Sequence, residues 1–310
     1  MVQRFHDHVR QTLAAAGVAA ADAVVVACSY GPDSLALADA VIALGYDCTL
    51  VYVDHGLRPE AAREGHAVAD FAAAHGKRSH VVQVRLDRRR GGGLEEAARA
   101  ARYAALEAVA QGAWILVGHT ASDQAETVLS RLLRGAGVVG LAGIPAVRGR
   151  IVRPLLQLHR ADIDAYLAAR ALTAADDASN ESPVFARNRI RHQILPILRG
   201  ENPAVDAALV RTASSMREMA EALDWAVDRA LAEVGHRNGR LDAPALAALP
   251  PAIAKRLLTR LAAKHGAQLE ADHLEAALRL ASETAGTKSL SLPKLTLRRE
   301  YAELVLALRR

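Results

Sequence analysis

The sequence predicts an α/β protein: a doubly wound, mainly parallel sheet, followed by a smaller helical domain that ends in short strands. Short apolar runs alternate with helical stretches through the first two-thirds of the chain, which is typical of parallel strands covered by helices on both faces. Beyond residue 199 a long amphipathic pattern replaces this alternation. Because 310 residues exceed what one small core needs, we expect two domains, residues 1–200 and 201–310.

The first domain is expected to contain four buried strands, each a short apolar run, with helices between them. The strands are expected at residues 24–28, 48–53, 80–86 and 115–117, and the helices at 33–44, 59–75 and 94–110. Polar residues follow three of the strands, at 29–34, 54–55 and 118–120. Because ligands bind at the carboxyl ends of strands in open α/β sheets, these segments mark the expected site.

The second domain is expected to be mainly helical. Asn202-Pro203 is a strong helix start, because asparagine caps a helix and proline fits its first position. Apolar residues then recur at helical spacing to residue 234. Two more helices are expected at 251–263 and 272–281, and three short strands at 290–292, 295–297 and 304–308.

Composition argues against several classes of protein. Apolar residues make up 51% of the chain and charged residues 24%, which is ordinary for a globular protein. Two cysteines are too few for a disulfide framework and form no CxxC pair. No uncharged apolar run reaches about 18 residues, and residues 1–11 lack the apolar segment of a secretion signal. We therefore expect a cytoplasmic protein with no membrane span.

The basic residues are unevenly distributed. The net charge is +5, and two basic stretches, residues 77–102 and 187–199, suit a surface that follows phosphates. The alternative for each stretch is a solvated face. Arg187, Arg189 and Arg191 alternate in a way that packing on a helix or strand does not explain, which favours contacts with anions.

The segment 29–34, Ser-Tyr-Gly-Pro-Asp-Ser, lies between an expected strand and an expected helix. Backbone N–H groups and the positive end of the helix can bind a phosphate chain there. Ser29 and Ser34 add hydroxyls, and the carboxylate of Asp33 could hold Mg²⁺ against the phosphates. The alternative is a polar turn in which Asp33 caps the helix.

Several other polar and aromatic residues have plain structural interpretations. Arg99 and Arg102 share a helix face that could simply be solvated, and Glu126 and Arg134 could be surface charges. Trp114 and Trp225 are expected in the core. The other histidines, such as His6 and His8, have no partners at metal-ligand spacing and receive no role.

Six ordered segments between residues 24 and 199 together resemble the tRNA(Ile)-lysidine synthases, a family of PP-loop ATP pyrophosphatases. They are the loop at 29–34, VDHGLR at 53–58, EAARAARYAAL at 96–106, Gly118-His119-Thr120 with DQAET at 123–127, RPLL at 153–156, and DASN at 177–180 with RNRIR at 187–191. The resemblance implies an adenine nucleotide alpha hydrolase-like fold. The C-terminal region resembles the family's short substrate-binding domain less sharply.

The resemblance also implies a two-step reaction. ATP adenylylates the wobble cytidine in the CAU anticodon of isoleucine tRNA, and the ε-amine of free L-lysine then displaces AMP to give lysidine. The implied cofactors are ATP and Mg²⁺, the implied partners are isoleucine tRNA and L-lysine, and the family suggests a homodimer.

The resemblance assigns three groups of residues. The catalytic group is Asp33, His55, Arg102, His119 and Asp123, of which His55, His119 and Asp123 are alternatives for orienting the lysine amine or accepting its proton. The ATP group is Ser29, Tyr30, Gly31, Pro32, Asp33, Ser34, Asp54 and Gly118, with Mg²⁺ on Asp33 and Asp123. The tRNA or lysine group is Asn180, Arg187, Asn188, Arg189 and Arg191.

Two residues depart from the family pattern. Tyr30 replaces a glycine of the loop, where a Cβ in the left-handed region costs on the order of 1 kcal/mol and the ring could fill the phosphate space. Ser122 replaces the first of two adjacent aspartates. They keep open a catalytically impaired paralogue that binds tRNA or nucleotide. Another PP-loop enzyme is the second alternative, although a thiolase would usually show paired cysteines and a glutaminase-coupled synthetase needs a further domain.

Overall fold

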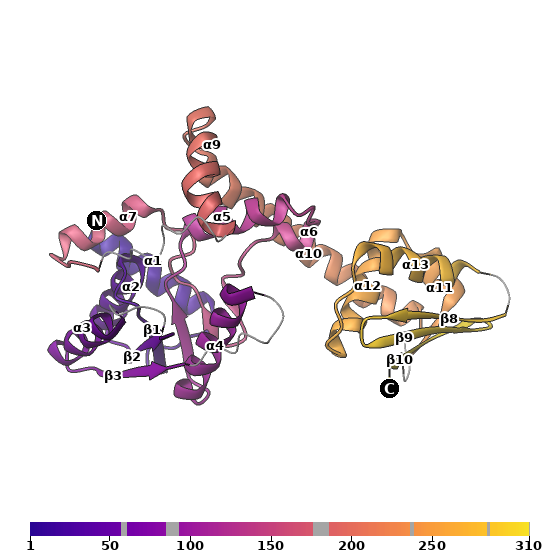
Figure 1. The fold of residues 1–310 in the computed structure, drawn as a ribbon, viewed down its shortest axis with the longest axis horizontal. Helices are drawn as coiled ribbons and strands as arrows, with labels where there is room; N and C mark the ends of the chain where they lie inside the picture. The colour runs from indigo at the N-terminus through magenta and orange to yellow at the C-terminus, as the bar shows by residue number, and fades with distance from the viewer. Residues whose placement is uncertain (57–60, 85–92, 176–185, 236–238, 284–285, 310) are drawn as a thin grey trace. The chain divides into compact units, whose positions relative to one another are not determined.

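The computed structural model describes residues 1–56, 61–84, 93–175, 186–235, 239–283 and 286–309 (Figure 1). The chain divides into two compact units, Met1–Ser215 and Met216–Arg310, and helix α10 (Val205–Glu233) contains the boundary between them. Within the described ranges, no helix has the length and apolar character needed to cross a bilayer.

The first unit is built on a six-stranded sheet in the order β3-β2-β1-β4-β6-β5. Its strands are β1 (Ala23–Ala27), β2 (Asp47–Asp54), β3 (Arg78–Gln83), β4 (Trp114–Val117), β5 (Val147–Arg148) and β6 (Ile151–Val152). All pairings are parallel except that of β5 with β6. The chain runs outward from β1 through β2 to β3 and then returns to place β4 on the other side of β1. This reversal creates a crevice at the carboxyl ends of β1 and β4.

The helices of this unit are α1 (Val2–Ala15), α2 (Pro32–Ala43), α3 (Ala61–Ala74), α4 (Gly93–Ala110), α5 (Ala121–Leu132), α6 (Val138–Leu141), α7 (Arg160–Ala169), α8 (Ala186–Arg189), the π-helical turn η2 (Ile190–Ile194) and α9 (Leu195–Glu201). Both faces of the sheet are covered by helices. Val24 and Val26 of β1 pack in a core with α1, α2, α3 and α7, whereas Val25 faces the α4 side. The predicted α/β class is confirmed, and the helices that were not among those expected from the sequence are α1, α5, α6, α7, α8, η2 and α9.

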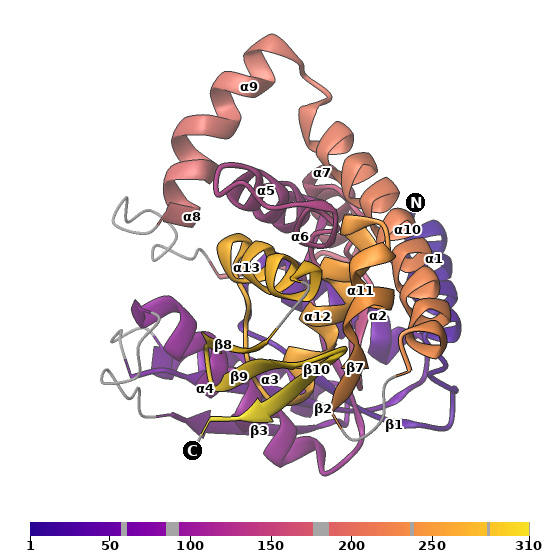
Figure 2. The same cartoon turned by 90° about the vertical axis from the view of Figure 1, so that its right-hand side faces the viewer.

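The second unit has a four-stranded antiparallel sheet in the order β7-β10-β9-β8. The strands are β7 (Arg240–Asp242), β8 (Thr287–Leu292), β9 (Leu295–Glu300) and β10 (Glu303–Leu308), and the helices beside the end of α10 are α11 (Ala243–Ala248), α12 (Pro251–Lys264) and α13 (Ala271–Ser282). Figure 2 shows these three helices on one side of the sheet. Leu295, Leu297 and Leu304 point into the shared core, so the predicted short strands are confirmed.

The expectation that Trp225 lies in the core is wrong. Its side chain is 61% exposed on α10, and the guanidinium of Arg229 lies 4.4 Å from the centre of its ring. The buried stripe of this part of the helix passes through Val227 and Ala230, and Trp225 lies off that stripe. Trp114 is half-buried and donates from Nε1 to Asp22 over 3.2 Å.

Arg299 ties the sheet of the second unit to α13. It takes an inward position on β9, is 4% exposed, and donates from Nη1 to the carbonyls of Leu280 (3.2 Å) and Ala281 (2.5 Å). The last carbonyls of a helix lack partners within the helix and carry its negative end. A buried guanidinium therefore satisfies two of them and matches their charge.

We predict that Arg299→Leu lowers the free energy of unfolding by about 2–4 kcal/mol, because it leaves buried carbonyls unpaired. Arg298→Leu is the matched control, since Arg298 is the exposed neighbour on the same strand, and it should change stability by less than about 0.5 kcal/mol. Urea unfolding followed by circular dichroism measures both. Equal losses in the two variants would contradict this role for Arg299.

Candidate functional site

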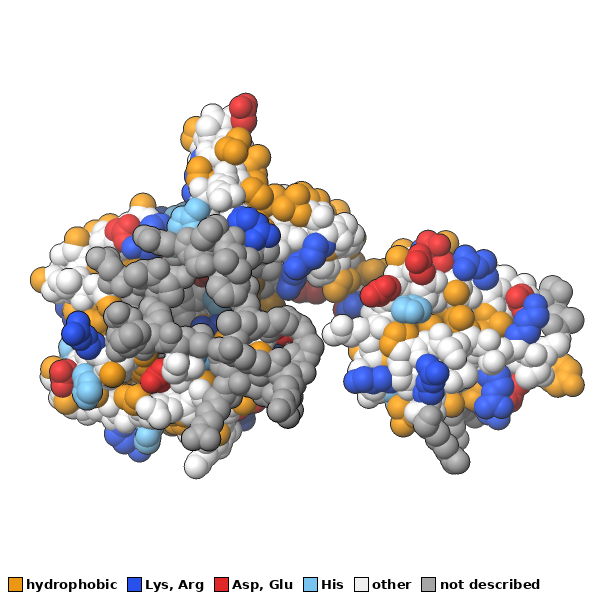
Figure 3. All heavy atoms as spheres, in the orientation of Figure 1, with side chains coloured by type: hydrophobic (Ala, Val, Ile, Leu, Met, Phe, Trp, Pro, Cys, Tyr) orange, Lys and Arg blue, Asp and Glu red, His pale blue; other side chains and the backbone are white. Residues whose placement is uncertain are grey.

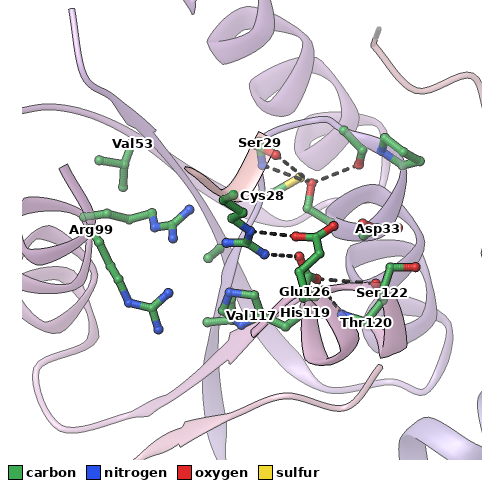
Figure 4. Close-up of a pocket in the computed structure, with 18 of the residues that line it drawn as sticks. Cys28, Ser29, Asp33, Val53, Arg99, Val117, His119, Thr120, Ser122 and Glu126 are labelled. Atoms are coloured by element: carbon green, nitrogen blue, oxygen red, sulfur yellow. Dashed lines mark hydrogen bonds and ion pairs between the residues drawn. The ribbon is translucent and has the colours of Figure 1, made fainter. Parts of the chain in front are cut away.

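A cavity of about 1020 Å³ opens at the carboxyl ends of β1, β2 and β4, within the first unit (Figure 4). The first turns of α2, α5 and α7 line it, as do the end of β2, one face of α4, and residues of α8 and η2. The three polar segments expected to converge, at 29–34, 54–55 and 118–120, all contribute to its wall.

The loop before α2 is organised by the hydroxyl of Ser34. This oxygen accepts from the amide of Ser29 at 3.1 Å, donates to the carbonyl of Gly31 at 3.0 Å, and lies 3.2 Å from the Ser29 hydroxyl. Helix α2 begins at Pro32 with Gly31 as its N-cap, and the first turn faces the cavity. The N–H groups of a first turn lack intrahelical acceptors, so this wall can bind an anionic oxygen.

Tyr30 adopts the left-handed conformation that the loop requires, with φ +62°. Its ring makes an edge contact with Phe71 of α3, with 6.5 Å between ring centres, and packs against the main core instead of lining the cavity. Its carbonyl accepts from the amide of Ala175 at 3.0 Å. The expectation that the ring could fill the phosphate space is therefore wrong, because the backbone directs the side chain toward α3.

Gly118 ends β4 where the strand closely approaches the first turn of α2. A Cβ at this position would lie 3.0 Å from the carbonyl oxygen of Asp33 and 3.1 Å from the amide of Ser34. Both contacts are with backbone, which cannot rotate away. Gly118 is thus needed for the close approach of two walls of the cavity.

Asp33 presents a buried carboxylate oxygen to this wall. Its Oδ1 makes no hydrogen bond among the described residues, and the nearest charge is the Arg160 guanidinium at 3.9 Å. Burial, and then the neighbouring Asp123 carboxylate, raise the pKa of Asp33 from 3.8 to about 6. Mg²⁺ takes one or two carboxylates together with substrate phosphates, so this oxygen fits such an ion. No cluster of three or more His, Cys, Asp or Glu ligands occurs in the described part of the chain.

A cluster of buried charges lies in the cavity wall on the same side as Asp33. Glu126, whose side chain is 2% exposed, accepts from Nε of Arg187 at 2.7 Å and from Nε of Arg191 at 2.5 Å. Arg187 also donates to Oδ1 of Asp123 at 2.5 Å, while Oδ2 of Asp123 accepts from the Thr120 amide at 2.7 Å and caps α5. A magnesium ion on Asp123 would have to displace Arg187.

These pairs correct two interpretations of the sequence. Glu126 is a buried ion-pair partner rather than a surface charge, although Arg134 is exposed as expected. Arg187 and Arg191 are four apart on the continuous turns of α8 and η2, so they share one face, while Arg189 points outward. Helical packing against carboxylates thus explains the spacing of Arg187 and Arg191.

The electrostatic balance at Asp123 follows from the same contacts. Burial alone would raise the pKa of this carboxyl, but the guanidiniums of Arg187 and Arg191 and the hydrogen bond from the Thr120 amide together hold it below its ordinary value. Asp123 is therefore an ionised structural anion and a weak proton acceptor.

Arg99 and Arg102 form the wall that α4 contributes, and Figure 4 shows Arg99 across the cavity from Asp33 and Glu126. Neither guanidinium has an ion pair with a carboxylate in the ranges that the structure describes, and both lie over the buried ring of Tyr103, at 5.3 and 5.8 Å. Burial lowers the pKa of Arg102 from its ordinary value. These arginines line the cavity and do not form a solvated face.

The remaining residues assigned from the sequence are placed as follows. Asp54 and His55 line the cavity at the end of β2, where Oδ1 of Asp54 accepts from the Gly56 amide at 2.7 Å. Asn188 also lines it, Ser122 lies in the wall beside Asp123, and His119 forms part of the wall at the end of β4. Asn180 lies outside the described residues.

Sequence reasoning did not assign several charged residues that line the cavity or contact a residue of its wall. Arg99, Glu126 and Arg160 line the cavity, and Arg153 donates to His119 in its wall. Arg99 and Glu126 each had a usable local signal, because Arg99 lies one turn before Arg102 on α4 and Glu126 lies one turn after Asp123 on α5. Arg153 and Arg160 reach the site or its supporting contacts from distant parts of the chain.

Comparison with known proteins gives the same two-part organisation. A PP-loop domain model matches residues 1–198, and a TilS substrate binding domain model matches residues 241–305. The tRNA(Ile)-lysidine synthase of Thermobifida fusca is 42% identical over 281 residues, which cover 87% of this chain and 86% of that protein. The tRNA(Ile)-lysidine synthase of Streptomyces coelicolor is 40% identical over 307 residues, covering 94% and 87%.

Among solved structures, the U34-tRNA thiolase NcsA from Methanococcus maripaludis aligns with a TM-score of 0.58. The alignment covers 70% of this chain and 80% of that one, at 16% identity. At this identity the likeness is one of fold alone.

We predict that Tyr30→Gly changes the KM for ATP by less than about threefold, or about 0.7 kcal/mol, because the ring lies outside the cavity. Tyr30→Ala keeps the left-handed φ but loses the contact with Phe71, so its free energy of unfolding should fall by about 1–2 kcal/mol. Steady-state kinetics and urea unfolding measure these effects. A large decrease in KM on Tyr30→Gly would mean that the ring obstructs the nucleotide.

The raised pKa of Asp33 gives a pH-dependent stability. Below about pH 4 the group is protonated in both the folded and the unfolded chain, and as the pH rises toward 6 the unfolded chain ionises first, so stability is lost. Asp33→Asn should therefore stabilise the protein at pH 7.5, on the order of 1 kcal/mol after allowance for solvent screening, and this advantage should vanish near pH 4.

Asp70→Asn, on the exposed side of α3, is the control for this measurement. Its unfolding midpoint should follow that of the unaltered protein across the same pH range. An advantage of Asp33→Asn that persists undiminished at pH 4 would rule out ionisation of Asp33 as its cause.

Proposed function

The chain belongs to the tRNA(Ile)-lysidine synthase family, and we propose that its cavity uses ATP to adenylylate the wobble cytidine of isoleucine tRNA and then joins L-lysine to it. The observation that carries this proposal is the convergence, in one cavity, of a helix N-terminus, an Asp33 oxygen without a hydrogen bond and two arginines that form no ion pair with a carboxylate, as judged from the residues that the structure describes. Such a cavity can hold a polyphosphate between positive walls while keeping a carboxylate beside it.

The first step transfers an adenylyl group from ATP to the oxygen on carbon-2 of cytosine and releases pyrophosphate. The first turn of α2, with the hydroxyls of Ser29 and Ser34, is suited to stabilise the charge of the departing pyrophosphate. Asp33 would hold Mg²⁺, which supplies neutralising charge to the phosphates when bound. Arg102, with Arg99, would steady the adenylate from the opposite wall.

The second step needs a deprotonated lysine amine, whose reference pKa is about 10.4. Of the three candidates from the sequence, Asp123 is already paired with Arg187 and has a lowered pKa. The Nδ1 of His119 already accepts a hydrogen bond from Arg153. We therefore favour His55, at the cavity wall, as the group that receives or relays this proton.

Free lysine would meet both signs of charge in this cavity. Its ammonium groups suit Asp123 and Glu126, and its carboxylate suits an arginine such as Arg191. Because Arg187 and Arg191 now bind those two acids, entry of lysine would exchange one cation for another. Arg189 points outward and Asn188 lies at the wall, so we assign this pair to the RNA.

We assign recognition of the tRNA body to residues 201–310 and the chemistry to residues 1–200. The match to a substrate binding domain over residues 241–305 supports this assignment. Figure 3 shows basic side chains together with acidic and apolar ones on the visible face of that unit, and the basic side chains are suited to contact phosphates. Because tRNA and free lysine occur together in the cytoplasm, we propose that the protein acts there. We also propose that it is a homodimer, as the family resemblance suggests.

The two alternatives are not favoured. Both cysteines are buried, and burial raises the pKa of the Cys28 thiol to about 11, so neither thiol is suited to sulfur transfer. The hypothesis of a catalytically impaired paralogue depends partly on Tyr30. The ring of Tyr30 lies away from the cavity, so it gives this hypothesis no support.

The test is release of pyrophosphate from ATP in the presence of lysine and an isoleucine tRNA transcript with a CAU anticodon. Release should depend on the tRNA, and lysidine should form in the RNA. Asp33→Asn should slow release by about a hundredfold or more, whereas Asp70→Asn should not. Tight tRNA binding without pyrophosphate release would contradict the proposed reaction.

A further inference from the structure

We propose that His119 is held as the neutral imidazole with its proton on Nε2, and that it donates this N–H to an anionic oxygen of the bound nucleotide. In this role it accepts no proton during the reaction, and Arg153 is the positioning residue that fixes its state. The proposal rests on the proposed function only for the identity of the acceptor. The tautomer itself follows from contacts within the protein.

The first step of the argument is the position of Arg153. Its side chain is 1% exposed, and each of its hydrogen-bonding nitrogens meets a neutral acceptor. Nη1 donates to the carbonyl of Pro145 at 2.8 Å, Nη2 to the Tyr103 hydroxyl at 3.2 Å, and Nε to Nδ1 of His119 at 3.1 Å. These partners leave the guanidinium without a carboxylate among the described residues.

The second step follows from the chemistry of the donor. An arginine side chain has only N–H donors and keeps its charge at any pH a protein tolerates, so the atom that faces Nε must be an acceptor. Nδ1 of His119 is therefore unprotonated, and a neutral imidazole then carries its proton on Nε2. Protonation would place an imidazolium beside a buried guanidinium.

Every charged group around the ring bears on this state. Burial, first, and then the guanidiniums of Arg153, Arg102 and Arg187 oppose protonation, while the Asp123 carboxylate favours it. Burial and the arginines prevail, and they lower the pKa of His119 to about 3. The ring is thus neutral throughout the range in which the protein works.

The third step is that the Nε2–H group of His119 is available at the cavity wall. His119 lines the cavity directly after Gly118, the residue in close approach to the first turn of α2. Nε2 has no hydrogen-bond partner among the described residues, and Figure 4 shows the ring beside Glu126 and Val117 at the cavity wall. A guanidinium at Nδ1 draws electron density from the ring and strengthens Nε2–H as a donor. A neutral histidine of this kind can polarise an oxygen without becoming a base.

Nitrogen-15 NMR of histidine-labelled protein tests the tautomer without reference to turnover. The His119 signals, identified by their loss in His119→Gln, should show an unprotonated Nδ1 and a protonated Nε2 from pH 5 to 9. Titration of His119 between pH 6 and 7, or a proton on Nδ1, would overturn the proposal. Neither result would bear on whether the protein makes lysidine.

The role of Arg153 is tested in the same spectra. Arg153→Met removes the buried charge, so His119 should begin to titrate toward the ordinary histidine range, and pyrophosphate release should acquire a new loss of rate at acid pH. Arg150→Met, at an exposed arginine three residues earlier, is the matched control and should leave both unchanged. Tyr103→Phe removes one acceptor from Arg153 without touching the imidazole and should preserve the tautomer. An unaltered His119 signal in folded Arg153→Met would reject Arg153 as the positioning residue.

Single-turnover pyrophosphate release distinguishes a hydrogen-bond donor role of His119 from a general-base role. His119→Gln keeps an N–H near the position of Nε2, so it should retain the rate within about tenfold, whereas His119→Ala should lose about a hundredfold. If His119 acted as a general base, His119→Gln would lose as much activity as His119→Ala, because a glutamine side chain does not accept a proton. Equal and complete loss in both variants would contradict the donor role even if the NMR tautomer were as proposed.

Discussion

The parallel arrangement of β1, β4 and β6 is the constraint from which the site follows. Helices that follow parallel strands begin at the same edge of the sheet, and α2, α5 and α7 accordingly all place their first turns on one cavity. Each first turn brings unpaired N–H groups and the positive end of a helix dipole. The fold thus produces a region of positive potential before any basic side chain is added, and the reversal of strand order at β1 keeps that region open.

The positive helix ends and the neighbouring guanidiniums stabilise the ionised acidic side chains Asp123 and Glu126 in the cavity. Asp123 caps α5 with one oxygen and binds Arg187 with the other, and Glu126 is held by two guanidiniums. A buried ion pair of this kind is expensive to desolvate, and its value for the protein is the fixed geometry that it imposes. Asp33 is the exception, since its oxygen keeps no hydrogen bond. A buried carboxylate oxygen without a hydrogen bond favours binding of a cation. Asp33 therefore points to a functional role and not to a contribution to stability.

Local sequence could predict the parts of the site that follow directly from a strand-to-helix connection. Ser29, Asp33 and Ser34 lie within six residues, and the chain on either side sets their positions. The pairing of Arg187 with Glu126 spans 61 residues, and only tertiary packing brings these two side chains together. The same holds for Arg153, which meets Tyr103 across 50 residues. The apolar ring of Trp225 alone could not predict its exposure, because the angular position of a residue on the helix decides its burial.

The direction of the Tyr30 side chain has a consequence for how such loops are recognised in databases of sequences. The loop is defined by a dihedral angle and by the hydroxyl of Ser34, and this chain keeps both although Tyr30 replaces the first of the two glycines. A search that demands two consecutive glycines would discard this protein at its most diagnostic segment. A profile that weights the serines, the aspartate and the flanking strand and helix would retain it, and would also admit bulky residues wherever a hydrophobic recess like the one beside Phe71 is available.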